Sequence, residues 1–134
     1  MTATGFVYSS PEPTIKNALD WIVGSGELYT KPVAVISAGT SGGVYARQMM
    51  IQTLTWQGAH VVAELGIASP RPKSDADGQF VDDATITEIE RLAALLVEVL
   101  ALDAGDRLAL VRAVVDAAHV DPGHIAPLAQ TPAG

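Results

Sequence analysis

The sequence predicts an α/β fold in which helices cover a parallel sheet. Short apolar runs alternate along the chain with segments whose apolar residues recur at helical spacing. This alternation favours parallel strands joined by right-handed crossovers. The central run, Val33–Ile36, is rich in β-branched residues and lies between Pro32 and a cluster of small residues. It therefore fits a strand buried on both faces, around which the rest of the chain is organised.

Six further segments complete the expected order of elements. Phe, Val and Tyr favour a strand in the first of them, and apolar residues spaced three and four apart define one face of each helix. The strongest helix begins at Thr85, because Thr85 and Glu88 have the spacing of a capping box. In chain order, the segments are the strand Gly5–Ser9, the helices Thr14–Val23 and Val44–Gln57, the strand Val61–Ile67, and the helices Thr85–Leu100 and Asp106–Ala118.

Composition and charge limit the classes of function. The 134-residue chain is 49% hydrophobic and 17% charged, which is typical of a globular domain with a substantial core. Its formal net charge of −7 makes nucleic acid or an anionic membrane an unfavourable partner. The absence of Cys excludes disulfides, thiolate catalysis and Cys-ligated metals. No signal-peptide pattern and no bilayer-spanning apolar run is seen, so we expect a cytoplasmic protein.

We expect two parts along the chain. Residues 1–102 would form the α/β domain, and residues 103–134 would add an appended helix and a loose tail. The tail, from Val120 onwards, contains three prolines and two glycines. Terminal segments of this composition are commonly loose.

The small-residue cluster Ser37–Gly43 is the first candidate for a ligand-binding loop. A strand, a glycine-rich turn and a helix leave backbone N–H groups free at the helix N-terminus, where they can bind an anion or a polar ligand edge. In open α/β sheets, ligands bind beyond the carboxyl ends of the strands. The alternative is an ordinary turn that uses glycine only for tight geometry.

Four segments resemble the NADPH-dependent FMN reductase family, a flavodoxin-like group. Ser10–Glu12 is similar to the start of the family's TPEYN loop, Thr14–Trp21 to its KNALDW helix, Lys31–Gly43 to its strand and SAS-x-GG segment, and Leu54–Val62 to the stretch that follows. The match runs from about Phe6 to Leu100, and its specificity comes from four motifs in the right order and spacing. The resemblance implies a flavodoxin-like three-layer α/β sandwich with a parallel sheet. Here it would be truncated to strands three to five of the family fold, with an extra C-terminal helix.

The resemblance also implies a function, namely an NAD(P)H-dependent FMN or quinone reductase. In such oxidoreductases FMN carries the hydride transfer and NAD(P)H donates the electrons, so neither a catalytic side chain nor a metal is expected. The residues implied to bind the cofactor are Ser10, Pro11, Glu12, Ser37, Ala38, Gly39, Thr40, Ser41, Gly42 and Gly43.

Two departures from the family pattern bear on this function. The family's first strand, with the Ser/Arg loop that holds the FMN phosphate, has no counterpart, and Pro13 directly after Glu12 shortens a wall of the flavin site. We therefore expect impaired FMN binding. Each lost hydrogen bond to the charged phosphate would reduce the binding free energy by ~1.5–3 kcal/mol. One alternative is a non-catalytic flavodoxin-like subunit or remnant that assembles with another chain. Another is a small α/β protein that binds a different anionic ligand at Ser37–Gly43.

Assembly is expected for two reasons. The family forms dimers, and the resemblance implies that the helices Thr14–Val23 and Val44–Gln57 contribute to the contact. In a sheet of three strands, the strand at Phe6–Ser9 would also present a free edge that is prone to pair with another chain. We therefore expect a homo-oligomer or a pair with a complementing chain.

Other polar residues have simpler interpretations. Arg47 and Gln48 are positioned to contact a nucleotide, but side chains in the first turn of a surface helix are usually exposed, and we expect exposure here. His60 precedes a strand and is expected on a surface loop. His119 and His124 lack the i, i+4 spacing of a zinc-binding helical pair.

Overall fold

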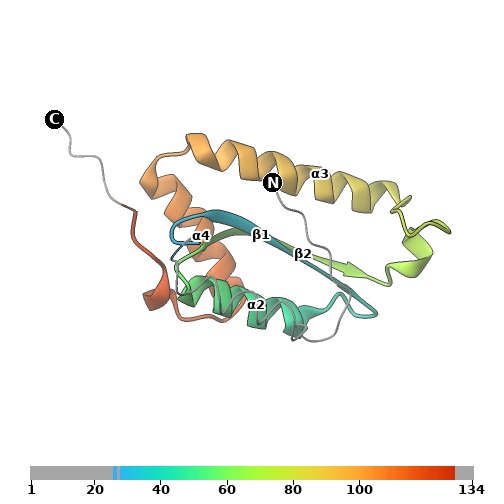
Figure 1. The fold of residues 1–134 in the computed structure, drawn as a ribbon, viewed down its shortest axis with the longest axis horizontal. Helices are drawn as coiled ribbons and strands as arrows, with labels where there is room; N and C mark the ends of the chain where they lie inside the picture. Colours follow the sequence, from blue (N-terminus) through green and yellow to red (C-terminus); the bar gives the residue numbers. More distant parts are fainter. Residues whose placement is uncertain (1–25, 27, 129–134) are drawn as a thin grey trace.

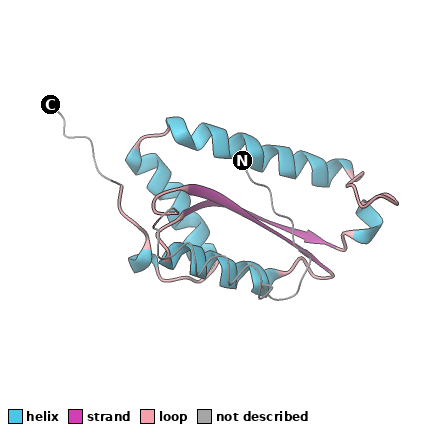
Figure 2. Ribbon diagram, viewed as in Figure 1, coloured by secondary structure: helices cyan, strands magenta, loops and turns pink. Residues whose placement is uncertain are grey.

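The computed structural model describes residue 26 and residues 28–128, which form an α/β arrangement of two strands and three helices (Figures 1 and 2). The predicted strand Gly5–Ser9 and helix Thr14–Val23 lie outside the described residues. The described elements are β1 (Pro32–Gly39), α2 (Val44–Trp56), β2 (His60–Ala68), α3 (Asp83–Glu98) and α4 (Ala104–Ala117), with short 3-10 turns at Arg71–Lys73, Val99–Ala101 and Pro122–His124.

The two strands pair in parallel, as the alternation of apolar runs and helices predicts. Their register runs from Pro32 opposite His60 to Gly39 opposite Ala68, with one irregularity between Val33 and Ala34. β1 therefore continues through Ser37, Ala38 and Gly39, which the sequence assigned to the loop. The small residues remain extended because each one pairs with a residue of β2, a contact that the local sequence does not reveal.

Helices cover both faces of this sheet, so the described part has the three layers expected of a flavodoxin-like fold. In Figure 1, α3 lies above the strands and α2 lies below them. Both helices contact β1 and β2, and α4 contacts β2 and α2. No helix in the described part of the chain is both long enough and apolar enough to cross a lipid bilayer.

One apolar core joins the sheet to helices α2 and α4. It contains Val61 and Val62 of β2, Ile51 and Leu54 of α2, and the fully buried Val111 and Val115 of α4, as well as Val35, Ala59, Val99, Ala118 and Val120. Burying a side chain of this size contributes about 1.5–3 kcal/mol. The expected boundary at residue 103 therefore does not separate two cores, because α4 packs into the same one.

The segment after α4 also packs on the domain. Val120 and Ala126 are buried, and the ring of His124 lies 4.9 Å from that of Trp56, centroid to centroid. The expectation of a loose tail is therefore wrong for residues 120–126, while residues 129–134 lie outside the described part.

The expected surface position of His60 is also wrong, because this side chain is fully buried beneath the returning segment.

Both α3 and α4 begin at an aspartate cap. The Asp82 carboxylate accepts the backbone N–H of Thr85 at 3.0 Å and its hydroxyl at 2.7 Å. The Asp103 carboxylate accepts the N–H of Asp106 at 2.8 Å. Each helix consequently starts two residues before its predicted start, because the cap is an aspartate upstream. Helix α2 differs, since its N-cap is Gly43 and no side chain caps it.

Candidate functional site

The loop between β1 and α2 consists of Thr40–Gly43 and depends on two consecutive glycines. Gly42 and Gly43 have φ angles of 82° and 65°, in the left-handed region that side chains rarely adopt. A Cβ on Gly43 would also lie 3.1 Å from the Cβ of Ser37. Glycine at both positions therefore lets the chain turn tightly at the carboxyl end of β1.

This turn leaves backbone donors free at the start of α2. Within the described residues, no acceptor receives the N–H groups of Gly43, Val44 or Tyr45. The first turn of α2 also has no acidic residue, so nothing there offsets the partial positive charge of the helix N-terminus. Together with its place at the end of a parallel strand, this makes the loop suitable for the polar edge of a ligand.

Arg47 supports the loop from within the fold. Its Nη1 donates to Ser37 Oγ at 2.7 Å and to the Gly42 carbonyl at 3.0 Å, and its Nε lies 3.3 Å from Glu64 Oε2. The side chain is only 14% exposed, so the expectation of an exposed arginine is wrong. The reason is Gly66 in β2, where a Cβ would lie 2.5 Å from Arg47 Nη1. Glycine at position 66 gives the guanidinium its space.

The described part brings together seven of the ten residues that the resemblance assigned to the cofactor. Thr40, Ser41, Gly42 and Gly43 form the loop, whereas Ser37, Ala38 and Gly39 belong to β1. The Ser37 hydroxyl is buried and donates to the Gly42 carbonyl at 2.5 Å, so it supports the loop from beneath. Ser10, Pro11 and Glu12 lie outside the described residues.

Sequence reasoning did not anticipate the roles of Arg47, Glu64 and Gly66. One available signal was Gly66 itself, which lies within the strand between the apolar residues Leu65 and Ile67. An isolated glycine in a strand often marks a place where another group approaches closely.

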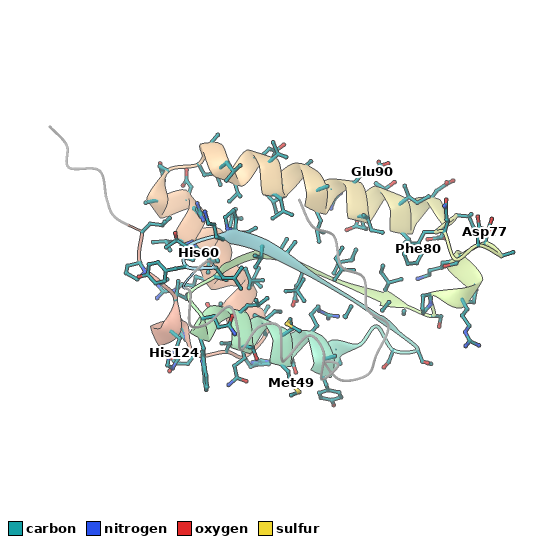
Figure 3. The ribbon with its side chains drawn as sticks, viewed as in Figure 1. Met49, His60, Asp77, Phe80, Glu90 and His124 are labelled. Carbon is teal, nitrogen blue, oxygen red and sulfur yellow. The ribbon has the colours of Figure 1, made fainter. Side chains whose placement is uncertain are left out.

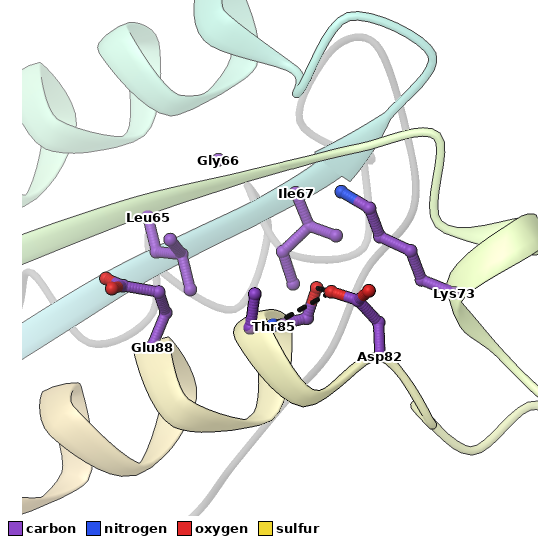
Figure 4. Close-up of a pocket in the computed structure, with 8 residues that line it drawn as sticks. Leu65, Gly66, Ile67, Lys73, Asp82, Thr85 and Glu88 are labelled. Atoms are coloured by element: carbon purple, nitrogen blue, oxygen red, sulfur yellow. Dashed lines mark hydrogen bonds between the residues drawn. The ribbon is translucent and has the colours of Figure 1, made fainter.

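A separate cavity of about 200 Å³ lies between the end of β2 and the start of α3 (Figure 4). Leu65, Ile67, Lys73, Asp82, Thr85 and Glu88 are among its lining residues. The pKa of Asp82 is lowered, chiefly by the hydrogen bond from the Thr85 hydroxyl and then by that from the Thr85 N–H. This carboxylate is already committed to capping α3, and the cavity carries charges of both signs. The backbone N–H groups that have no acceptor among the described residues lie at the loop, so the loop is the candidate site for the ligand.

His60 and His124 lie at the other end of the sheet (Figure 3). His60 begins β2, and Figure 3 shows His60 and His124 at the end opposite Asp77 and Phe80. Across the described ranges, no three His, Cys, Asp or Glu side chains gather in a way that could hold a metal ion.

Comparison with known proteins identifies the family. The family model for NADPH-dependent FMN reductase matches residues 2–72, more than half of the 134-residue chain. The matched region includes β1, the loop, α2 and β2. Neither the curated proteins nor the solved structures contain a match to this chain. On the family match, together with the strand–loop–helix geometry, the chain belongs to the NADPH-dependent FMN reductase family.

Proposed function

We propose that this chain is an NAD(P)H-dependent reductase of the FMN reductase type, in which Thr40–Gly43 binds the isoalloxazine ring of FMN. The observation that carries the proposal is the set of N–H groups at Gly43, Val44 and Tyr45, which have no acceptor within residues 28–128. The pyrimidine side of the flavin ring presents carbonyl oxygens and ring nitrogens that accept such donors. Bound FMN would supply the hydride-accepting ring, with NAD(P)H as donor. The protein would bind and orient the ring.

The electrostatics of the loop support binding of the ring without strong anchoring of the phosphate. A phosphate is usually held by several charge-assisted hydrogen bonds. Arg47 is the cation that contacts this loop in the described part. Its guanidinium already donates hydrogen bonds to Ser37, Gly42 and Glu64. We therefore infer that FMN binds weakly, and that its phosphate adds little to the affinity.

Titration with two flavins tests this proposal. The purified 134-residue chain is titrated with FMN and with riboflavin, which lacks the phosphate, while the quenching of flavin fluorescence is followed. Saturable binding of both, with dissociation constants within about threefold, is the expected result. Oxidation of NADPH at saturating FMN then tests turnover. No saturable binding of either flavin contradicts the proposal, and FMN binding at least a hundredfold tighter than riboflavin contradicts weak anchoring.

We further propose that the chain assembles with a second copy of itself through α2. Tyr45 is 76% exposed, Met49 45% and Trp56 58%. With Gln52 they are spaced four, three and four residues apart, which is the seam of a paired helix. We call these four residues the α2 stripe. Figure 3 shows Met49 on the outer side of α2, pointing away from the sheet.

Charge supports a second copy as the partner. The α2 stripe carries no charged side chain, and the one charged residue of α2, Arg47, is turned inward. Two chains of net charge −7 repel each other least where such a neutral face meets its equivalent. In a two-fold pair, each residue of one stripe meets a residue of the other reciprocally. Pairing with a different, complementing chain would be the alternative outcome of an association experiment.

A further inference from the structure

We infer that Arg47 is a positioning residue, which holds the Gly42–Gly43 peptide so that the Gly43 N–H faces the bound flavin. The inference rests on the proposed function and assigns a role to a side chain beneath the loop. Arg47 would not touch the flavin. It would act through the backbone that does.

The Gly42 carbonyl oxygen is held by two donors. Ser37 Oγ lies 2.5 Å from it and Arg47 Nη1 lies 3.0 Å from it. In a trans peptide the C=O and the next N–H point in opposite directions. Because the carbonyl is directed at the buried Ser37 and the inward-turned Arg47, the Gly43 N–H is directed away from them. This N–H has no acceptor in the part of the chain that the structure describes.

The orientation needs such support because both flanking residues are glycines. Glycine occupies positive and negative φ with similar ease. The peptide between Gly42 and Gly43 therefore meets little steric resistance to rotation. The two hydrogen bonds to its carbonyl select one orientation among those that the glycines permit.

Arg47 is itself fixed by contacts outside the loop. Glu64 of β2 holds Nε at 3.3 Å, and the missing side chain of Gly66 leaves room for Nη1. The planar guanidinium offers several N–H groups in a fixed arrangement, whereas a lysine ammonium is a single point of charge. One arginine can therefore link the end of β1, the loop and β2 simultaneously.

Flavin affinity separates this role from a general contribution to stability. Arg47→Met removes the donor to Gly42 and the ion pair with Glu64, whereas Arg91→Met removes an arginine whose side chain is 73% exposed on α3. We expect Arg47→Met to raise the dissociation constant for riboflavin about tenfold, and Arg91→Met to change it less than twofold. Thermal unfolding of both variants is measured alongside. Equal losses of affinity in the two variants would overturn the inference.

A second measurement needs no flavin, so it separates failure of this inference from failure of the proposed function. The amide resonances of Gly42 and Gly43 are recorded in ¹⁵N spectra of the unliganded protein. Arg47→Met should shift or broaden both, and Arg47→Lys, which keeps a cation beside Glu64, should do so as well. The control is Arg91→Met, which removes an exposed partner of Glu88 on α3. Unchanged resonances in both Arg47 variants would refute the positioning role even if the wild-type chain binds flavin.

Discussion

The Nε2 of His60 lies 2.7 Å from the carbonyl oxygen of Ala126, 66 positions further along the chain. Both residues are buried, and His60 Nδ1 has no hydrogen-bond partner within the described residues. Burial is the main cause that lowers the pKa of His60 below 6.5; the Ala126 hydrogen bond opposes this shift and the charge of Arg107 adds to it. The neutral ring, with its proton on Nε2, therefore joins the returning C-terminal segment to β2.

The burial of His60 predicts that acid destabilises the fold. The pKa of His60 is lower in the folded than in the unfolded chain. The stability that the neutral ring contributes to the folded state is therefore fully present above about pH 6.5, and it is lost as the pH falls towards the folded pKa. Urea unfolding between pH 8 and pH 5 should show this decline. In His60→Gln the decline should be shallower. Equal slopes in the variant and in the wild type would count against His60 as the cause.

Helix α4 should unfold together with the family-matched region. Val115→Ala shortens a fully buried side chain and is expected to lower the free energy of unfolding by about 2 kcal/mol. Val97→Ala, on the exposed side of α3, should change it by less than about 0.5 kcal/mol. Circular dichroism and Trp fluorescence should report one common transition in each variant. Separate transitions would mean that α4 is an independent unit.

The loop should depend on glycine at position 43 for binding as well as for folding. Gly43→Ala places a Cβ 3.1 Å from Ser37 Cβ at a φ of 65°, and we expect about tenfold weaker flavin binding. The control is Gly78→Ala, at a φ of 78° with no atom within 4 Å of the new Cβ. Both substitutions carry the left-handed backbone cost of about 1–2 kcal/mol, so a difference in flavin titration isolates the loop. The same affinity in both variants would show that the loop is not the flavin site.

A charge in the α2 stripe should separate the two copies. Met49→Glu puts a carboxylate at the middle of the stripe, opposite its counterpart in a two-fold pair, and should weaken self-association at least tenfold. Val97→Glu adds the same charge on the outer side of α3 and should leave association unchanged. Sedimentation velocity at low micromolar concentration measures both. A wild-type chain that sediments as a monomer would contradict assembly through this face.

The elements that local patterns determine could be predicted from sequence. Apolar spacing identified α2, α3 and α4, and the β-branched run identified β1 because each signal lies within one segment. Arg47 could not be placed in this way, since its burial depends on Glu64 and Gly66 in the next strand. The burial of His60 could not be predicted for the same reason, because the segment that covers it contains Ala126, near the end of the described chain. The resemblance located the loop, but the hydrogen bonds that shape it are tertiary contacts.

The close approach of Gly66 to Arg47 makes the two positions dependent on each other in evolution. A lineage that gains any side chain at position 66 loses the space for the guanidinium, because even a Cβ would lie 2.5 Å from Nη1. The displaced guanidinium then loses its contacts with the Gly42 carbonyl and with the carboxylate at position 64. Positions 47, 64 and 66 should therefore vary as a set among relatives, and their joint presence would distinguish sequences that hold the loop in this way.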